Sequence, residues 1–265
     1  CLIVMGSEGR NEQIIKTDQD NALVVKDGID VEQYRPYMNE ITKHLIDFGY
    51  PPCEGNIMVS NPFWCKTVSE YKNETKRWIE APDMQNYMDL AIFFDSFAVA
   101  GDKDLLINLK DDLFNKLHDK DVFMAYFAKA TLTFDTPNTI ANFMTKSHNI
   151  DIKKAAVFPI VQGIRSLALR EKIRETTTVK RIKILEEKKI LERSKAAELL
   201  EAFDVVNTLR LKAQLDDIQD NKEVNNEIDT HTLGKIERDL LKDSFKIVIE
   251  FKKFINYTFR IDKIS

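Results

Sequence analysis

The sequence predicts an α+β protein, in which a small mixed-sheet domain precedes an all-α helical bundle. Short apolar runs separated by turn residues fill the first part of the chain, and apolar residues at helical spacing fill the rest. Glycine and proline number only 8 and 7 among 265 residues, and eleven of these fifteen lie in the first 101 residues. We therefore expect two domains, at residues 1–110 and 111–265.

The expected elements follow this division. Residues 1–5 are a continuous apolar run, and residues 21–25 are an asparagine followed by four apolar residues; both segments are typical of buried strands. Apolar residues three and four apart over 31–48 predict a helix with one buried face. Residues 55–59 predict a third short strand, and from residue 83 the pattern is almost wholly helical.

Composition excludes several classes of protein. There are 39 Lys and Arg against 43 Asp and Glu, so a generally basic nucleic-acid-binding surface is disfavoured. Three cysteines, at 1, 53 and 65, offer neither a disulfide framework nor zinc-ligand spacing, and a reducing cytoplasm suits them best. No apolar run approaches the roughly 20 residues of a membrane-spanning helix.

The chain begins inside its first apolar run, without an initiator methionine. That run has neither the basic segment nor the cleavage site of a signal peptide. We therefore expect a piece of a longer protein, from which the first helix of the sheet domain is missing.

A pair of carboxylates precedes the second predicted strand. Asp18 and Asp20 are two residues apart, which in an extended chain places both on one face with Cα atoms about 6.5 Å apart. Two carboxylates at that distance repel each other unless a cation lies between them. Mg²⁺ and Mn²⁺ prefer such oxygen ligands. Taken alone, the pair is also compatible with ordinary surface residues.

A second motif ends the first predicted strand. Glycine at Gly6 lets backbone amides approach a ligand closely, and the Ser7 hydroxyl adds a donor for phosphate oxygens. A helix beginning here would add further amide donors, and Arg10 can form a bidentate phosphate contact. A phosphate cradle beside an acid pair is much more specific than either motif alone.

The string GSEGRNEQ followed by TDQDNAL resembles the DNA polymerase β-type nucleotidyltransferase superfamily. It is most similar to the branch related to the PII-protein uridylyltransferase, whose members in bacteria often follow CBS and cyclic-nucleotide-binding domains. The resemblance continues along nearly the whole chain, in residues 55–64, 93–102, 149–153 and 159–169.

The resemblance implies transfer of a nucleoside monophosphate from a nucleoside triphosphate (NTP) to an acceptor. Gly6 and Ser7 would hold the triphosphate, and Asp18 and Asp20 would bind two Mg²⁺ or Mn²⁺ ions. The helical domain would bind the acceptor, a small regulatory protein or a small molecule, in bacterial signal transduction.

The third carboxylate of the superfamily pattern is harder to assign. The third predicted strand offers only Glu54 at its edge and otherwise Asn56, which we assign to nucleotide binding. Asp95 is the better catalytic candidate, although a structural capping or pairing role suits it equally. Related sequences often carry arginine where this chain has Phe97, which puts full catalysis in doubt.

Further residues are open to two interpretations. Lys153 and Arg165 are predicted to contact the nucleotide or acceptor, while Asp151 can equally cap a helix. Phe63 and Trp64 can stack on a base or belong to the core. The main functional alternative is a non-catalytic nucleotide-binding regulatory module, coupled to a sensor domain. A glycosyltransferase would use the acid pair but not the upstream Gly-Ser.

Overall fold

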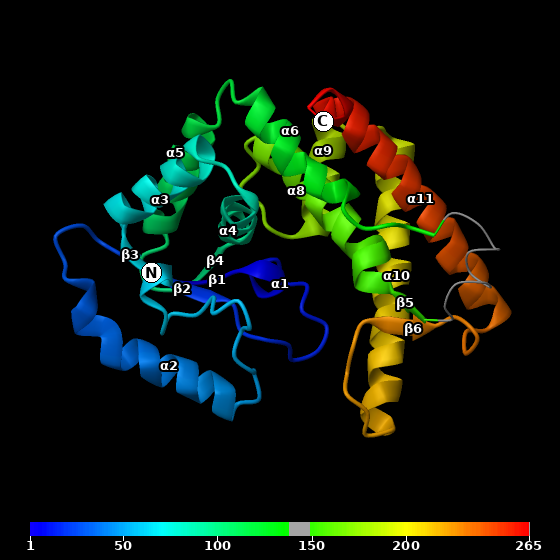
Figure 1. Ribbon diagram of the computed structural model, residues 1–265, viewed down its shortest axis with the longest axis horizontal. Helices are drawn as coiled ribbons and strands as arrows, with labels where there is room; N and C mark the ends of the chain where they lie inside the picture. The colour runs from blue at the N-terminus through cyan, green and yellow to red at the C-terminus, as the bar shows by residue number, and fades with distance from the viewer. Residues whose placement is uncertain (138–148, 265) are drawn as a thin grey trace. The chain divides into compact units, whose positions relative to one another are not determined.

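The computed structural model describes residues 1–137 and 149–264 and is drawn in Figure 1. Its elements are those of an α+β protein, which confirms the predicted class. None of the helices in this described part is both long and apolar enough to span a membrane.

The chain forms two compact units. The first contains Cys1–Lys120 and Lys172–Thr177, and the second contains Asp121–Glu171 and Thr178–Ser265. Residue 110, where we expected the first domain to end, lies within helix α5 (Asp104–Lys116).

The first unit is built on a four-stranded sheet with the order β3-β2-β1-β4. Strand β1 is antiparallel to β2 and β4, and β2 is parallel to β3, so the sheet is mixed as expected. The bounds of the strands are Leu2–Val4 for β1, Asn21–Val25 for β2, Cys65–Thr67 for β3 and Phe97–Ala100 for β4.

The prediction of a strand at residues 55–59 is wrong, because this segment forms turns. Asn56 has a left-handed backbone with φ of 53°, which ends any extended run. Val59 is fully buried, but its N–H donates to the side chain of Asn21 rather than to a strand partner, at 2.8 Å. The apolar residues Met58 and Val59 are therefore buried from a loop and not from a strand.

Helices surround the sheet of the first unit. The helix predicted at 31–48 is confirmed as a 3-10 turn that leads into α2. Tyr71 of α3 stacks on Phe93 of α4, and Trp78 meets the same ring edge-on. The helices are α1 (Gly6–Gly9), α2 (Arg35–Asp47), α3 (Val68–Glu80), α4 (Met84–Phe94) and α5.

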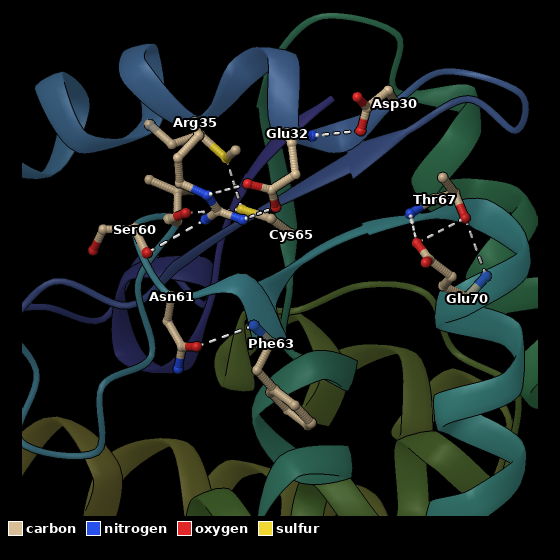
Figure 2. A network of polar contacts seen from close by, with 11 residues as sticks. Asp30, Glu32, Arg35, Ser60, Asn61, Phe63, Cys65, Thr67 and Glu70 are labelled. Carbon is tan, nitrogen blue, oxygen red and sulfur yellow. Dashed lines mark hydrogen bonds and ion pairs between the residues drawn. The ribbon is translucent and has the colours of Figure 1, made fainter.

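Figure 2 shows polar contacts at the start of α3 and beside the start of α2. The Thr67 hydroxyl accepts the backbone N–H of Glu70, whose carboxylate accepts the N–H of Thr67 in return, at 2.7 Å. This capping box starts α3. Arg35 pairs with Glu32 at 2.6 Å and donates to the carbonyl of Ser60, which ties α2 to the loop before β3.

The second unit is a helical bundle with a two-stranded ribbon that the sequence did not predict. Strand β5 (Asn149–Asp151) is antiparallel to β6 (Glu227–Asp229). Asp151 accepts the N–H of Lys154, in the π-helical turn Lys153–Val157 that follows, at 3.0 Å. The helices are α6 (Asp121–Lys129), α8 (Phe158–Arg170), α9 (Thr178–Glu187), α10 (Arg193–Gln219) and α11 (Lys235–Phe259).

A glycine allows two helices of the bundle to approach each other closely. Gly163 of α8 faces Phe251 of α11, and a Cβ at Gly163 would lie 2.5 Å from that ring. Residues 159–169 are all buried, so α8 is the central helix of this core.

Candidate functional site

The site begins where β1 ends and β2 starts. Met5 donates its N–H to the carbonyl of Asp20 at 2.8 Å, so the antiparallel pairing of the two strands continues to this point. The next residue, Gly6, has φ of +55°, and a Cβ there would overlap Oδ2 of Asp20. A side chain at position 6 would require the Asp20 carboxylate to move.

Three side chains form a group that can hold a metal ion. Asp18, Asp20 and Cys53 each offer a ligand atom, and these atoms lie within 4.8 Å of one another. Asp18 is exposed, whereas the side chain of Cys53 belongs to a residue only 9% exposed. The two aspartates are the ones that the sequence predicts as metal ligands.

Buried Gln19 holds residues 50–53 next to the acid pair through hydrogen bonds. Its backbone N–H donates to the carbonyl of Pro51 at 3.1 Å, and it forms an isolated parallel bridge with Pro52. Its side-chain amide donates to the carbonyls of Tyr50 and Thr42 at 3.3 and 3.4 Å. Residues 18–20 and 50–53 are therefore held together by backbone contacts.

Asn21 completes this framework from the first position of β2. Its amide donates to Oε1 of Gln19 at 3.2 Å and accepts the N–H of Val59 at 2.8 Å. Its own N–H donates to the carbonyl of Ile57 at 3.0 Å. The loop before β3 is thus fixed against the acidic site.

Glu8 adds a third carboxylate near Asp20. Burial raises the pKa of Glu8, and the negative charge of Asp20 raises it further, while a hydrogen bond from the Asp20 N–H opposes the change. Sequence reasoning missed Glu8, although it lies within the same GSEGR string and one turn of α1 suffices to bring it close.

Cys53 was also missed. Burial raises the pKa of its thiol to about 12, and the thiol also forms a hydrogen bond with the Asp20 carboxylate. No spacing rule connects a single cysteine to an acid pair more than thirty residues earlier, so only the folded chain reveals the group.

Arg10 and Asp95 meet each other. Nη1 of Arg10 lies 2.7 Å from Oδ2 of Asp95, and Nε lies 2.7 Å from Glu12. Burial tends to lower the pKa of Arg10, but these two carboxylates outweigh it and raise the pKa. Gly9 packs so tightly that a Cβ there would overlap the carbonyl of Asp95. The ion pair therefore holds α1 against the end of α4, and Asp95 is not part of the group of three residues that can hold a metal ion.

The other predicted residues are spread over both units. Ser7 lies in the first turn of α1, and Asn56 lies in the turn before Asn61, whose amide donates to its carbonyl at 2.9 Å. Lys153 opens the π-helical turn of the second unit, where Arg165 is buried and donates to Gln162 of the same helix.

A polar pocket of about 310 Å³ lies beside residues 55–64 in the first unit. Trp64 is 2% exposed and packs against Trp78, so most of its ring belongs to the core. Phe63 and Arg77 line the pocket, as does Asp89, whose pKa burial raises.

Two family models match the chain. One, described as "Putative nucleotidyltransferase substrate binding domain", matches residues 121–259, more than half of the chain. The other, described as "Putative nucleotidyltransferase DUF294", matches residues 1–85. The chain belongs to this nucleotidyltransferase family. No curated protein matches it.

The match agrees with the division of the nucleotidyltransferase chain into units, because the substrate-binding model begins at Asp121, where the second unit begins. Nucleotidyl transfer takes its group from an NTP. The acidic site fits the divalent cation that such chemistry commonly uses: Asp18 and Asp20 supply oxygen ligands, and the absent Cβ of Gly6 leaves room beside Asp20.

Proposed function

We propose that the chain transfers a nucleoside monophosphate from an NTP to an acceptor, with Asp18 and Asp20 holding Mg²⁺ or Mn²⁺. The observation that carries this proposal is the contact between Gly6 and Asp20. The glycine turn and the acid pair, a dozen residues apart in sequence, occupy one place at the end of β1.

The protein groups would act by positioning and charge. When bound, the cation supplies neutralisation of the triphosphate and activation of the acceptor hydroxyl. The backbone amides of the turn at Gly6 would donate to phosphate oxygens, and the hydroxyl of Ser7, in the same turn, would donate to the same oxygens. Gln19 and Asn21 hold the acid pair in place, so little reorganisation is needed during the reaction.

In this proposal Asp95 and Arg10 stabilise the site without contacting the metal ion or the NTP. Their buried ion pair fixes the turn that carries Gly6 and Ser7, which favours a positioning role for both. A third catalytic carboxylate at Asp95, and nucleotide contacts from Asn56, Lys153 and Arg165, remain predictions from the sequence.

The resemblance to the PII-protein uridylyltransferase favours a protein acceptor in bacterial signal transduction. On the same basis we propose a cytoplasmic protein with CBS or cyclic-nucleotide-binding domains preceding this chain. The second unit, which matches a substrate-binding domain, would bind the acceptor.

Label transfer tests the proposal. The protein is incubated with Mg²⁺, each α-phosphate-labelled NTP and cell lysate, and labelled products are sought. Replacement of Asp18 and Asp20 by asparagine should abolish labelling and weaken NTP binding in calorimetry. Asp47→Asn, which changes an exposed carboxylate on α2, is the matched control and should label normally. Unaltered binding of NTP and metal by the double variant would contradict the proposal.

One observation favours the alternative of a regulatory nucleotide-binding module. Phe97 stands where related sequences often have arginine, and its side chain is 56% exposed on β4. If that arginine contacts phosphate, this chain lacks the contact. NTP binding that depends on Asp18 and Asp20, without label transfer to any acceptor, would support the alternative.

A further inference from the structure

The pocket beside residues 55–64 is not used by the chemistry proposed above. We propose that this pocket binds the base of the NTP and that its oxygen atoms select guanine. The inference rests on the proposed function, because it assumes that an NTP is bound. It goes further by naming where the base lies and which base is preferred.

The pocket has the size of one part of a nucleotide. Its volume of about 310 Å³ is at the lower end of the range for small-molecule sites, which is roughly 300–1,000 Å³. Ile57 and Phe63 line it with apolar and aromatic surface, against which a flat base can pack. Such a volume suits a base whose phosphates lie outside the pocket.

The loop that lines the pocket also contacts the acid pair. The Cys53 thiol forms a hydrogen bond with the Asp20 carboxylate, and a Cβ at Gly55 would lie 3.6 Å from Sγ of Cys53. The carbonyl of Ile57 accepts the N–H of Asn21 at 3.0 Å. Because Gly55 and Ile57 both line the pocket, it lies next to the site that would hold the phosphates.

Helix α4 supplies the polar wall of the pocket. Asp89 is 4% exposed, and Gln85 donates to its Oδ1 at 2.8 Å. Asn86 is 3% exposed, and its Nδ2 donates to the carbonyl of Ala81 at 2.7 Å, so its Oδ1 is on the other side of the amide. Within residues 1–137 and 149–264, Oδ2 of Asp89 and Oδ1 of Asn86 have no hydrogen-bond partner. Two buried side chains of the lining thus each keep one unused oxygen.

The charges of the lining also favour a ligand that donates hydrogen bonds. Asp83, which caps α4 by accepting the N–H of Asn86 at 2.7 Å, adds a second carboxylate. Arg77 lines the pocket too, but its Nε and Nη2 donate to Glu74 at 3.0 and 2.8 Å. A buried oxygen without a donor is costly, so the ligand that fits best brings N–H groups.

Guanine is the base that meets this requirement. Its Watson–Crick edge carries the N1–H and the N2 amino group side by side. Adenine and cytosine carry one amino group beside a ring nitrogen that accepts, and uracil carries one N–H between two carbonyls. Those acceptors would face the oxygens of Asp89 and Asn86 and be repelled, so the pocket would reject the other bases as well as bind guanine.

Calorimetry with α,β-methylene analogues of the four NTPs, which cannot be cleaved at that bond, tests the selection in the presence of Mg²⁺. The GTP analogue should bind at least about tenfold more tightly than the other three. Asp89→Asn keeps the acceptor for Gln85 and places an amino group where Oδ2 lies. It should weaken binding of the GTP analogue about tenfold and leave binding of the UTP analogue unchanged.

Two further variants separate the pocket from its surroundings. Phe63→Ala should weaken binding of all four analogues by a similar factor, because stacking does not depend on which base is bound. Glu80→Gln removes an exposed carboxylate at the end of α3 that is not part of the lining, and it should bind like the wild type. Circular dichroism verifies folding of each variant.

Equal affinity of the wild type for all four analogues would overturn the inference. A guanine preference that Asp89→Asn leaves unchanged would also overturn it, as would unchanged binding by Phe63→Ala. Failure of the proposed function would be seen elsewhere, as unaltered binding of NTP and metal by the Asp18→Asn, Asp20→Asn variant. Loss of binding in that variant, with equal wild-type affinity for the four analogues, would support nucleotidyl transfer and contradict guanine selection.

Discussion

Gly6 links backbone conformation to the chemistry of the site. Its φ of +55° lies in the left-handed region, which L-residues adopt at a cost, and Oδ2 of Asp20 lies where its Cβ would be. Gly28 has φ of +82° but no atom within 4 Å of its Cβ position. A substitution at Gly28 would therefore test the cost of the backbone conformation alone. A substitution at Gly6 would add a steric overlap with Asp20.

Replacement of either glycine by alanine should lower the free energy of unfolding by about 1–2 kcal/mol, the cost of a left-handed L-residue. Gly6→Ala should in addition displace Asp20 and weaken Mn²⁺ binding, whereas Gly28→Ala should bind Mn²⁺ normally. Chemical denaturation and calorimetry measure the two effects. Equal Mn²⁺ affinity in both variants would contradict this account of Gly6.

Asp89 gives a pH-dependent contribution to stability. Burial raises its pKa, and a hydrogen bond from Gln85 at 2.8 Å only partly opposes this. The folded chain therefore holds the proton more strongly than the unfolded chain does. Stability is lost as pH rises from the ordinary aspartate pKa of about 3.9 through the higher folded value.

Asp89→Asn should remove this loss, because asparagine keeps the acceptor for Gln85 without the charge. The variant should gain stability relative to the wild type as pH rises from about 4 to 7. Denaturation curves across this range measure the difference. A difference that does not depend on pH would show that Asp89 does not titrate in this way.

At the scale of elements, helices α8 and α11 depend on Gly163. Alanine there would raise helix propensity by about 1 kcal/mol but would overpack against Phe251, at a cost of about 1–3 kcal/mol. We expect Gly163→Ala to lower the free energy of unfolding, and Phe251→Leu to restore part of it in the double variant. A Gly163→Ala variant that is more stable than the wild type would contradict this, because it would mean that α8 and α11 can move apart at no cost in free energy.

The pattern of apolar residues correctly predicted those strands and helices in which the local sequence and the packing in the folded chain favour the same structure. Strands β1 and β2 and the helix over 31–48 are in this class. Strand β3 has the sequence Cys-Lys-Thr, which is not an apolar run, and β4 follows α4 without an intervening glycine or proline, so neither has a local signal. Residues 55–59 gave the opposite error: Met58 and Val59 are buried as strand residues would be, but they lie in a loop.

The site was predictable to a similar extent. Asp18 and Asp20 both lie just before β2, so their spacing alone predicts that their side chains lie close together. Cys53 reaches them only through the bridge formed by Gln19, and the partner of Arg10 is Asp95, which lies 85 residues away. Contacts of this kind are set by tertiary pairing, which no local spacing encodes.

At the scale of the whole molecule, the two units can be observed separately. Both tryptophans of the chain, Trp64 and Trp78, are buried in the first unit, so their fluorescence reports that unit alone. Circular dichroism reports the helices of both units. Residues 172–177 belong to the first unit but connect α8 with α9 of the second.

Leu241→Ala should therefore destabilise both units. Leu241 is fully buried in α11, and its loss should cost about 2–5 kcal/mol in the second unit. Because unfolding of that unit releases the ends of segment 172–177, the fluorescence midpoint should fall with the midpoint from circular dichroism. Leu240→Ala, at a residue 41% exposed, is the control. A fluorescence midpoint that stays at its wild-type value would show that the units unfold independently.

The same segment has a consequence for synthesis on the ribosome. Because a chain grows from its N-terminus, residues 1–120 emerge before the residues at 172–177 that complete their unit. The ribosome must first translate residues 121–171, which begin the other unit. The first unit, in which Asp18, Asp20 and Cys53 are already synthesised, is therefore incomplete until residues 172–177 have been made. The first unit can therefore be completed only after residues 121–171 have been synthesised.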